Sequence, residues 1–403
     1  MRRRTQKTAT HFLILLLILG LICFLNRPQS PHKLFAWDRI RYRTRATTLP
    51  AANGVCPGLD ESGRPALVVS HVDSDGETGW LDALRGKFQV CVYHIDISTS
   101  TSTSTSTVEK KNTNTDPNTD TDIHPRNPSS NTPSEYAGYL QVPTNRAHEA
   151  ITYLTFLIDN YATIPSSGAV FIHGSRFAWH NDDPHYDNLS LLKSLNQPFA
   201  LHASGYHNLR CDWSLSTCSP AAGPQGSLEN SVQAVLQPWS ARTVSDRGLP
   251  GALEEIFGPS GDVGMGMGMG SRLGRTDTVR AQCCAQFAVS RDGVWQHSRE
   301  EYVALRQWLL DGMDGRRGAA PKDDRVAGRI ISYIWHILFM KRDGAGVDLG
   351  ELNRKACPSA EECYCRLYGR CGLRCSTPGS CLGQYVLPKH LRLPEDWAET
   401  HAS

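Results

Sequence analysis

The chain has 403 residues, of which 40% are hydrophobic and 20% are charged, enough for a sizeable core in one large domain or two. Its 42 basic and 40 acidic residues leave a formal net charge of +2, which gives no electrostatic case for nucleic acid as a partner. Composition leaves the other classes of globular protein open.

The N-terminus predicts a signal anchor that attaches the protein to a membrane. An apolar stretch, 12–25, follows four basic residues, and counting from residue 9 it reaches the roughly 17 residues that a span needs. No small-x-small cleavage site follows it, which favours an anchor over a cleaved signal peptide. Basic residues on both sides leave the orientation open. We therefore expect a cytosolic tail, a transmembrane helix, a stem, a lumenal body and a second tail at 1–10, 11–25, 26–64, 65–390 and 391–403.

Cysteine usage predicts an oxidising compartment. Cys23 lies in the apolar stretch, and the other twelve of the 13 cysteines lie in the body, six of them in 357–381. Their density indicates disulfides, because the CxxC spacings of zinc ribbons are absent from the sequence. Cys211 and Cys218 are close enough to pair, and Asn188 begins a sequon for N-linked sugar. We expect the body in the lumen of the Golgi or endoplasmic reticulum.

Strand and helix patterns alternate along the body. Strands are predicted at 66–70, 88–95, 169–173 and 284–291, and helices at 78–86, 144–161, 186–195, 298–310 and 325–340. Thr144 or Asn145 caps the second helix, and Ser298 with Glu301 forms a capping box. Two low-complexity segments, 98–135 and 261–271, are predicted as a disordered insertion and a loop. The alternation predicts an α/β fold with a mainly parallel sheet flanked by helices, closed by a disulfide-rich C-terminal segment.

Three of the predicted strands end at a histidine, namely His71, His94 and His173. Asp73 and Asp96 follow the first two strands, and the third is followed by Arg176 and the sequence HNDDPH at 180–185. Ligands of parallel α/β sheets bind at the carboxyl ends of the strands, so these groups are expected to converge on one edge. The alternative for each histidine is a partly buried, hydrogen-bonded side chain.

Several stretches resemble fungal membrane-anchored proteins that carry domain of unknown function 3431. They include VCVYHID, VPTNRAHEAITYLTFLIDNY, VFIHGSRFAWHNDDPHYDNLSLLKSLN and CPSAEECYCRLYG, and the resemblance covers most of 66–369. The usual Asn-Lys-Gly-Arg/His-Glu of that family reads Asn145-Arg146-Ala147-His148-Glu149 here, so alanine replaces the glycine. The two low-complexity segments look like local insertions.

The order of elements also resembles that of GT-A glycosyltransferases, which carry an acidic metal motif where this chain has His173. The resemblance implies a Mn²⁺ or Mg²⁺ site, for which the candidate ligands are His173, His180, Asp182 and His336. It implies phosphate contacts from Asn145, Arg146, His148 and Arg176, and a general base at Glu149 or Asp183. The expected activity is transfer of sugar from a nucleotide sugar to a glycan or glycoprotein.

Each of these candidates has a structural alternative. The NDDP sequence is typical of a turn with Asx caps before a helix, Arg146 and His148 of an exposed first helical turn, and His336 of a packed core helix. Two other functions stay open, a metal-dependent lumenal hydrolase and a non-catalytic disulfide-stapled protein of the secretory pathway or cell surface. The G-x-S-x-G signature is absent from the sequence, and structural use of Cys283 and Cys284 is favoured over a reactive pair.

Overall fold

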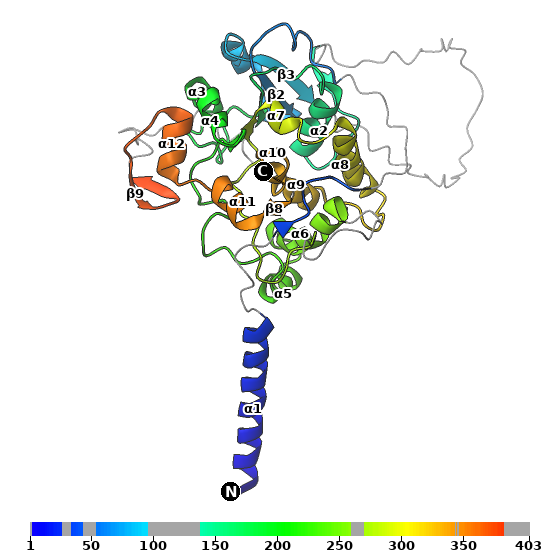
Figure 1. The fold of residues 1–403 in the computed structure, drawn as a ribbon, viewed down its shortest axis with the longest axis vertical. Helices are drawn as coiled ribbons and strands as arrows, with labels where there is room; N and C mark the ends of the chain where they lie inside the picture. The colour runs from blue at the N-terminus through cyan, green and yellow to red at the C-terminus, as the bar shows by residue number, and fades with distance from the viewer. Residues whose placement is uncertain are drawn as a thin grey trace, which may run out of the picture.

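The computed structural model describes residues 2–25, 34–42, 54–95, 138–258, 270–342, 344 and 346–382. Its central sheet has six strands, β2 (Ala66–His71), β3 (Gln89–His94), β4 (Leu140–Gln141), β5 (Ala169–His173), β6 (Tyr206–Asn208) and β7 (Phe287–Val289). Their spatial order is β4-β3-β2-β5-β7-β6, and only β7 runs antiparallel to the other strands. Figure 1 labels β2 and β3, which pair side by side. The predicted α/β fold with a mainly parallel sheet is confirmed.

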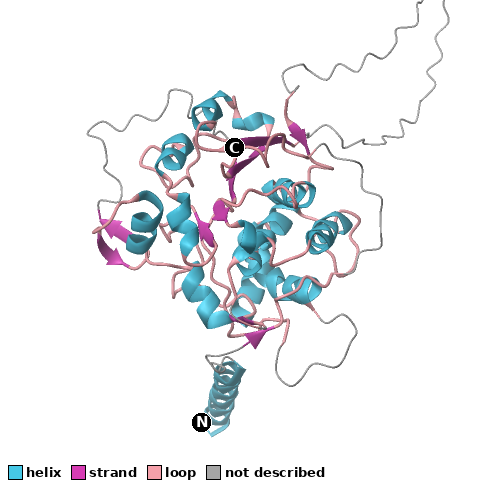
Figure 2. Ribbon diagram, turned by 45° about the horizontal axis from the view of Figure 1, so that its top comes forward, coloured by secondary structure: helices cyan, strands magenta, loops and turns pink. Residues whose placement is uncertain are grey.

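Helices cover both faces of this sheet (Figure 2). One face packs on α2 (Glu149–Asp159), α6 (Ala241–Phe257), α8 (Arg299–Asp311), α9 (Asp324–Ser332) and α10 (Trp335–Phe339). The other packs on the 3₁₀ helix Gly79–Leu84 and on α3 (Asn188–Ser194), α4 (Gln197–His202) and α12 (Ala360–Tyr368). Strands β2 and β5 are buried on both faces, which explains their continuous apolar sequences.

Further short elements complete the fold. They are β1 (Leu34–Phe35), the 3₁₀ helix Asp73–Asp75, α5 (Leu228–Leu236), α7 (Arg291–Val294), β8 (Val347–Asp348), α11 (Leu349–Ala356), β9 (Arg374–Thr377) and β10 (Ser380–Leu382). The predicted capping box forms at the start of α8, where the Ser298 and Glu301 side chains each accept the backbone N–H of the other. The single helix predicted at 325–340 was wrong, because the chain breaks at Tyr333 and Ile334 between α9 and α10.

All twelve cysteines of the body form disulfides, as predicted. The pairs are Cys56–Cys91, Cys211–Cys363, Cys218–Cys357, Cys283–Cys284, Cys365–Cys371 and Cys375–Cys381. Cys211 and Cys218, although close enough in sequence to pair, each bond to the C-terminal segment instead. Asn188 of the predicted sequon is fully buried and donates a hydrogen bond to the Gln286 side chain, so the folded chain does not present it for glycosylation.

Part of the predicted stem, 26–64, belongs to the body. β1 pairs with β8, and Phe35 and Trp37 are fully buried in the core. Aromatic side chains bury large apolar areas, so two of them are enough to hold this short segment against the body. The disulfide from Cys56 fastens residues 54–64 to β3.

The N-terminal segment forms α1 (Arg2–Leu25), which stands apart from the body in Figure 1. Its apolar side chains are well exposed, for example Phe12 at 61% and Leu17 at 66%. The described part of the chain contains no helix that is long and apolar enough to cross a membrane. Segments 98–135 and 391–403, and 261–269 of the Gly/Met loop, lie outside the described residues.

The buried carboxylate of Glu301 links the segment 34–42 to α8 and predicts that the stability of the fold decreases in acid. Glu301 accepts hydrogen bonds from the backbone of Ile40 and Ser298 and from the His297 ring. Burial raises its pKa, but these hydrogen bonds outweigh burial and lower the pKa to about 2. A depressed carboxyl pKa contributes stability above its unfolded value of about 4.5 and loses it as pH falls toward 2, about 2 kcal/mol between pH 6 and pH 3.

We expect the variant Glu301→Gln to lack this part of the pH dependence. Denaturant unfolding of both proteins at pH 6, 5, 4 and 3 measures the difference between their free energies of unfolding. We expect this difference to shrink toward low pH. Glu300→Gln changes the exposed neighbour and serves as the control. A difference between wild type and Glu301→Gln that stays constant from pH 6 to pH 3 would contradict this role for Glu301.

Candidate functional site

A cavity of about 300 Å³ opens at the carboxyl end of β5. Its walls come from the start of α2, the end of β5, residues 179–180, residues 215–217, the segment 281–285 and helix α9. The volume lies at the lower end of the range of roughly 300–1,000 Å³ that is typical of small-molecule sites. Four of the predicted site residues line it together: His148, Glu149, His173 and His180.

The first wall is the start of α2. Ala147 and His148 have positive φ angles of 56° and 54°, which a right-handed helix does not accommodate. The helix therefore begins at Glu149 with His148 as its N-cap, and the predicted caps at Thr144 and Asn145 were wrong. The His148 side chain makes no capping hydrogen bond. The N–H of Ala150 donates to the Ala147 carbonyl oxygen at 3.2 Å. The other first N–H groups of a helix have no partner within it, so this end offers donors to an anion.

The backbone at Ala147 adopts a conformation that glycine accommodates more easily than alanine. Its conformation lies in the left-handed region, where a Cβ atom costs about 1–2 kcal/mol and glycine costs nothing. We expect Ala147→Gly to unfold with a stability within about 0.5 kcal/mol of wild type or above it, because relief of strain offsets the lost methyl group. Denaturant unfolding measures the difference.

Ala150, three residues later in the first turn of α2 and equally buried, is the matched control. Glycine in a regular helix costs about 1 kcal/mol, so Ala150→Gly is expected to destabilise clearly. Equal losses in the two variants would show that Ala147 carries no backbone strain.

The second wall is helix α9, which the sequence did not single out. Arg325 and Arg329 line the cavity one turn apart. Arg325 also pairs with Asp323 at 3.1 Å, while the Arg329 guanidinium lies 5.6 Å from the Tyr333 ring and donates to its hydroxyl. The spacing of four residues between these side chains places them on one helix face, and this was the available signal in the sequence.

The α2 and α9 walls meet closely at Gly328. A Cβ atom at this position would lie 2.9 Å from the Ala147 carbonyl oxygen, closer than such contacts occur. Only glycine allows this approach, which sets His148 and the two arginines of α9 around one space.

The third wall is built from histidines and cysteines. His173 Nε2 lies 2.8 Å from the carbonyl oxygen of Cys284, and the rings of His173 and His180 are 4.7 Å apart. A carbonyl oxygen only accepts hydrogen bonds, so His173 Nε2 carries a hydrogen and the neutral ring keeps a lone pair on Nδ1. The Cys283–Cys284 disulfide lies in the same wall.

The structure places two predicted phosphate-binding arginines away from this cavity. Arg146 is only 2% exposed and donates to the carbonyl oxygens of Leu309 and Lys322 and to Asp324. It therefore clamps the segment before α9 to α8. Arg176 pairs with Asp187, and Asn145 is exposed outside the cavity lining.

Asp182 and Asp183 serve the local fold. Both oxygens of Asp182 accept the Tyr364 hydroxyl, at 2.8 and 2.9 Å, and one also accepts the backbone N–H groups of Cys211 and Asp212. Asp183 accepts the backbone N–H of His185 at 2.9 Å, which is the Asx turn of the structural alternative.

The four predicted metal ligands do not form one cluster. His173 and His180 are adjacent, Asp182 is bonded to Tyr364, and His336 lies 2% exposed in α10, where burial lowers its pKa to about 3. Across the residues that the structure describes, no three His, Cys, Asp or Glu side chains are grouped so that they could hold a metal ion. The Mn²⁺ or Mg²⁺ site stays a prediction.

The strand-end histidines do converge, as predicted, but in two groups. His71 and His94 face each other across adjacent strands with rings 5.8 Å apart, and His94 pairs with Asp73 at 2.8 Å. Burial lowers the pKa of His71, whose Nδ1 lies 3.8 Å from Asp75. His173 ends the next strand and belongs to the cavity instead. Asp96 lies outside the described residues.

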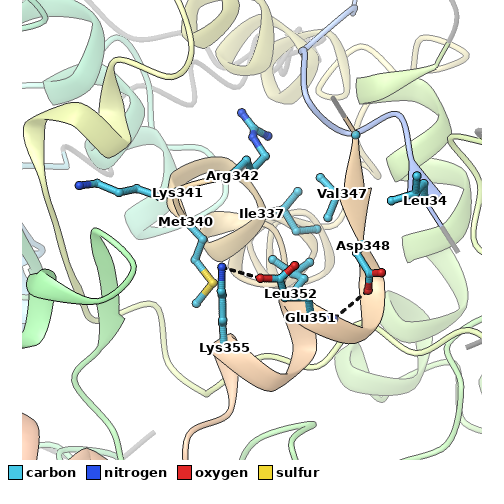
Figure 3. A pocket seen from close by; sticks show the side chains of 11 residues that line it. Leu34, Ile337, Met340, Lys341, Arg342, Val347, Asp348, Glu351, Leu352 and Lys355 are labelled. Atoms are coloured by element: carbon cyan, nitrogen blue, oxygen red, sulfur yellow. Dashed lines mark hydrogen bonds and ion pairs between the residues drawn. The ribbon is translucent and has the colours of Figure 1, made fainter. Parts of the chain in front are cut away.

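Figure 3 shows a second cavity, of about 170 Å³, between the end of α10 and α11. Its charged groups serve the fold: Lys355 pairs with Glu351 at 2.8 Å, and Asp348 accepts the N–H of Glu351 at 2.9 Å. Arg342 donates to the carbonyl oxygen of Trp37. None of the predicted site residues lines this cavity, which makes the cavity at the end of β5 the better candidate.

Comparison with known proteins gives one match. A family model described as a protein of unknown function, DUF3431, matches residues 67–366, about three quarters of the chain. No curated protein and no solved structure matches. The match covers every wall of the cavity.

Proposed function

We propose that this chain, which belongs to the DUF3431 family of proteins of unknown function, binds a nucleotide sugar in the cavity at the end of β5 and transfers the sugar to an acceptor hydroxyl. One observation carries the proposal: the cavity combines two arginines and an open helix end with a carboxylate, Glu149. Glycosyl transfer needs both, cationic groups for a diphosphate and a base for the acceptor.

The diphosphate faces the α9 wall in this proposal. Guanidinium groups bind phosphate oxygens in a planar, bidentate way, and Arg325 and Arg329 are spaced to reach neighbouring phosphates. The start of α2 adds N–H donors and a partial positive charge across the same space. These groups bind the diphosphate and stabilise the charge that develops on it as it leaves.

Glu149 acts as the base. It lies in the first turn of α2, on the cavity wall beside His148. As the acceptor oxygen forms a bond to the anomeric carbon, its proton passes to the carboxylate, and the bond from that carbon to the phosphate oxygen breaks. The nucleoside diphosphate departs with the electron pair of that bond.

The proposed compartment is the lumen of the secretory pathway. Six disulfides within one body indicate folding in an oxidising environment, since cytosolic thiols are kept reduced. Nucleotide sugars and glycan acceptors meet in the Golgi and the endoplasmic reticulum, so this location supports the proposed activity. Membrane attachment through residues 11–25 stays a prediction.

The test is an activity screen of the full chain against a panel of nucleotide sugars with mixed glycan acceptors, with release of nucleoside diphosphate as the readout. We expect one donor to react, and Glu149→Gln to lower its kcat by roughly 100-fold or more while donor binding is retained. Glu361→Gln on the exposed face of α12 is the matched control. Folded protein that releases no nucleoside diphosphate from any donor would refute the proposal.

A further inference from the structure

The disulfide between the neighbours Cys283 and Cys284 forms part of the cavity wall and serves no long-range link. The other five disulfides join residues at least six positions apart. Cys284 and Ala285 both have positive φ angles, of 83° and 46°, so this segment holds an unusual backbone. The bond replaces two thiols by a disulfide, which presents an apolar and polarisable sulfur surface to the cavity.

A second apolar surface, the ring of Trp179, borders the same cavity. The Trp179 side chain is 59% exposed although it lines the cavity wall. Its ring lies 5.4 Å from the His180 ring, which lies 4.7 Å from the His173 ring, which bonds to Cys284. The Trp179 ring and the disulfide are thus connected through the rings of His180 and His173. Exposure of a tryptophan beside a cavity leaves its apolar face open to a ligand.

Acceptors of hydrogen bonds line the same cavity. Gln282 lines the cavity and is only 8% exposed, yet its side-chain oxygen has no hydrogen-bond partner among the described residues. The neutral form of His173 has a lone pair on Nδ1, because its Nε2 donates to the Cys284 carbonyl oxygen. A buried acceptor without a donor is unfavourable, and a ligand that brings a donor would remove that cost.

We propose that this wall is a subsite for a saccharide ring, held between Trp179 and the Cys283–Cys284 disulfide with its hydroxyls donating to Gln282 and His173. The proposal rests on the proposed function and names the part of the substrate that this wall receives. A sugar ring has an apolar face of C–H groups and a rim of hydroxyl donors. Two apolar surfaces with a few buried hydrogen-bond acceptors match both features.

The division of the cavity also favours a sugar here over a phosphate. The cationic groups are on α9 and at the start of α2, whereas this wall carries acceptors and apolar surface. Phosphate oxygens only accept hydrogen bonds, so they gain nothing from the Gln282 oxygen. Hydroxyls donate, and they fit this wall.

The test titrates the full chain with methyl glycosides of glucose, galactose, mannose and N-acetylglucosamine, and separately with uridine and guanosine diphosphate. Binding is read by thermal shift and tryptophan fluorescence. We expect at least one methyl glycoside to bind, and its affinity to fall at least tenfold in Trp179→Ala and in Cys283→Ala with Cys284→Ala. Nucleoside diphosphate binding stays unchanged in both. The controls are Trp239→Ala, which removes an exposed tryptophan outside the cavity, and Cys365→Ala with Cys371→Ala.

Every outcome separates this proposal from the proposed function. Glycoside binding that is absent, or equal in wild type and the cavity variants, overturns the saccharide subsite even where a nucleoside diphosphate binds. Loss of nucleoside diphosphate binding in Trp179→Ala would assign the indole to a base and also overturn it. Glycoside binding without any nucleoside diphosphate binding would refute the proposed function and leave the saccharide subsite standing. Gln282→Ala, with the same expected loss, keeps the test valid where the cysteine variant does not fold.

Discussion

Removal of both long-range disulfides, Cys211–Cys363 and Cys218–Cys357, is expected to cost about 8 kcal/mol of stability, as much as the total of many domains. The bonds join residues 152 and 139 positions apart. Cross-linking a chain over such a loop lowers the entropy of the unfolded state by an amount worth about 5 kcal/mol.

The two bonds are nested, so their effects are not additive. With one bond intact, the other closes a remaining loop of only about 14 residues and contributes about 3 kcal/mol. We therefore expect each bond alone, removed by two Cys→Ser changes, to cost about 3 kcal/mol and both together to cost more than the sum. Denaturant unfolding without reductant measures the single removals, and circular dichroism measures the folded fraction after removal of both.

The Cys365–Cys371 bond provides the control, because it spans six positions and is expected to contribute about 2 kcal/mol. Strictly additive losses for the two nested bonds would contradict this explanation. So would a loss for Cys365–Cys371 as large as that for both nested bonds.

The second large effect is expected at Asp182. Its carboxylate is 1% exposed and accepts the Tyr364 hydroxyl and two backbone N–H groups. Asp182→Ala removes a hydrogen-bond acceptor from three buried donors, and each lost bond costs about 1–3 kcal/mol, so we expect a loss of about 4 kcal/mol. Denaturant unfolding without added metal measures it.

Two comparisons sharpen the Asp182 experiment. Tyr364→Phe removes one of the three donors and is expected to cost about 1 kcal/mol. A metal ligand behaves differently: its replacement would leave the metal-free protein nearly as stable as wild type and abolish stabilisation by added Mn²⁺. That pattern would restore the metal role that the sequence suggested.

The sequence was most informative where burial dictates the residue type. β2 and β5 read as continuous apolar runs because both faces are covered, and β5 has the predicted bounds. Ser298 and Glu301 indicated the start of α8 in the sequence, because a capping box is a local interaction. The disulfides followed from cysteine density, but their pairing depends on the fold, so nearness in sequence did not indicate the partners of Cys211 and Cys218.

The site was harder to predict because its residues come from distant segments. His148, Glu149, His173 and His180 were expected in a site and do share the cavity. Arg146 fits the same sequence pattern, yet its side chain points to buried carbonyls, since positive φ angles turn the chain at Ala147 and His148. Tertiary packing brings Arg329 and Trp179 to the site. The four-residue spacing of Arg325 and Arg329 places them on one helix face, but it does not tell which cavity that face lines.

The central claim is that the cavity at the end of β5 binds a nucleoside diphosphate through α9, and the most direct measurement is equilibrium binding of uridine and guanosine diphosphate to wild type and Arg329→Met. Arg317→Met, an exposed arginine outside the cavity, is the control. We predict that one diphosphate binds, stabilising the protein by about 2.7 kcal/mol at 100 times its Kd, and that Arg329→Met weakens it at least tenfold. No binding to folded wild type at millimolar concentration, or equal binding to Arg329→Met, would contradict the account.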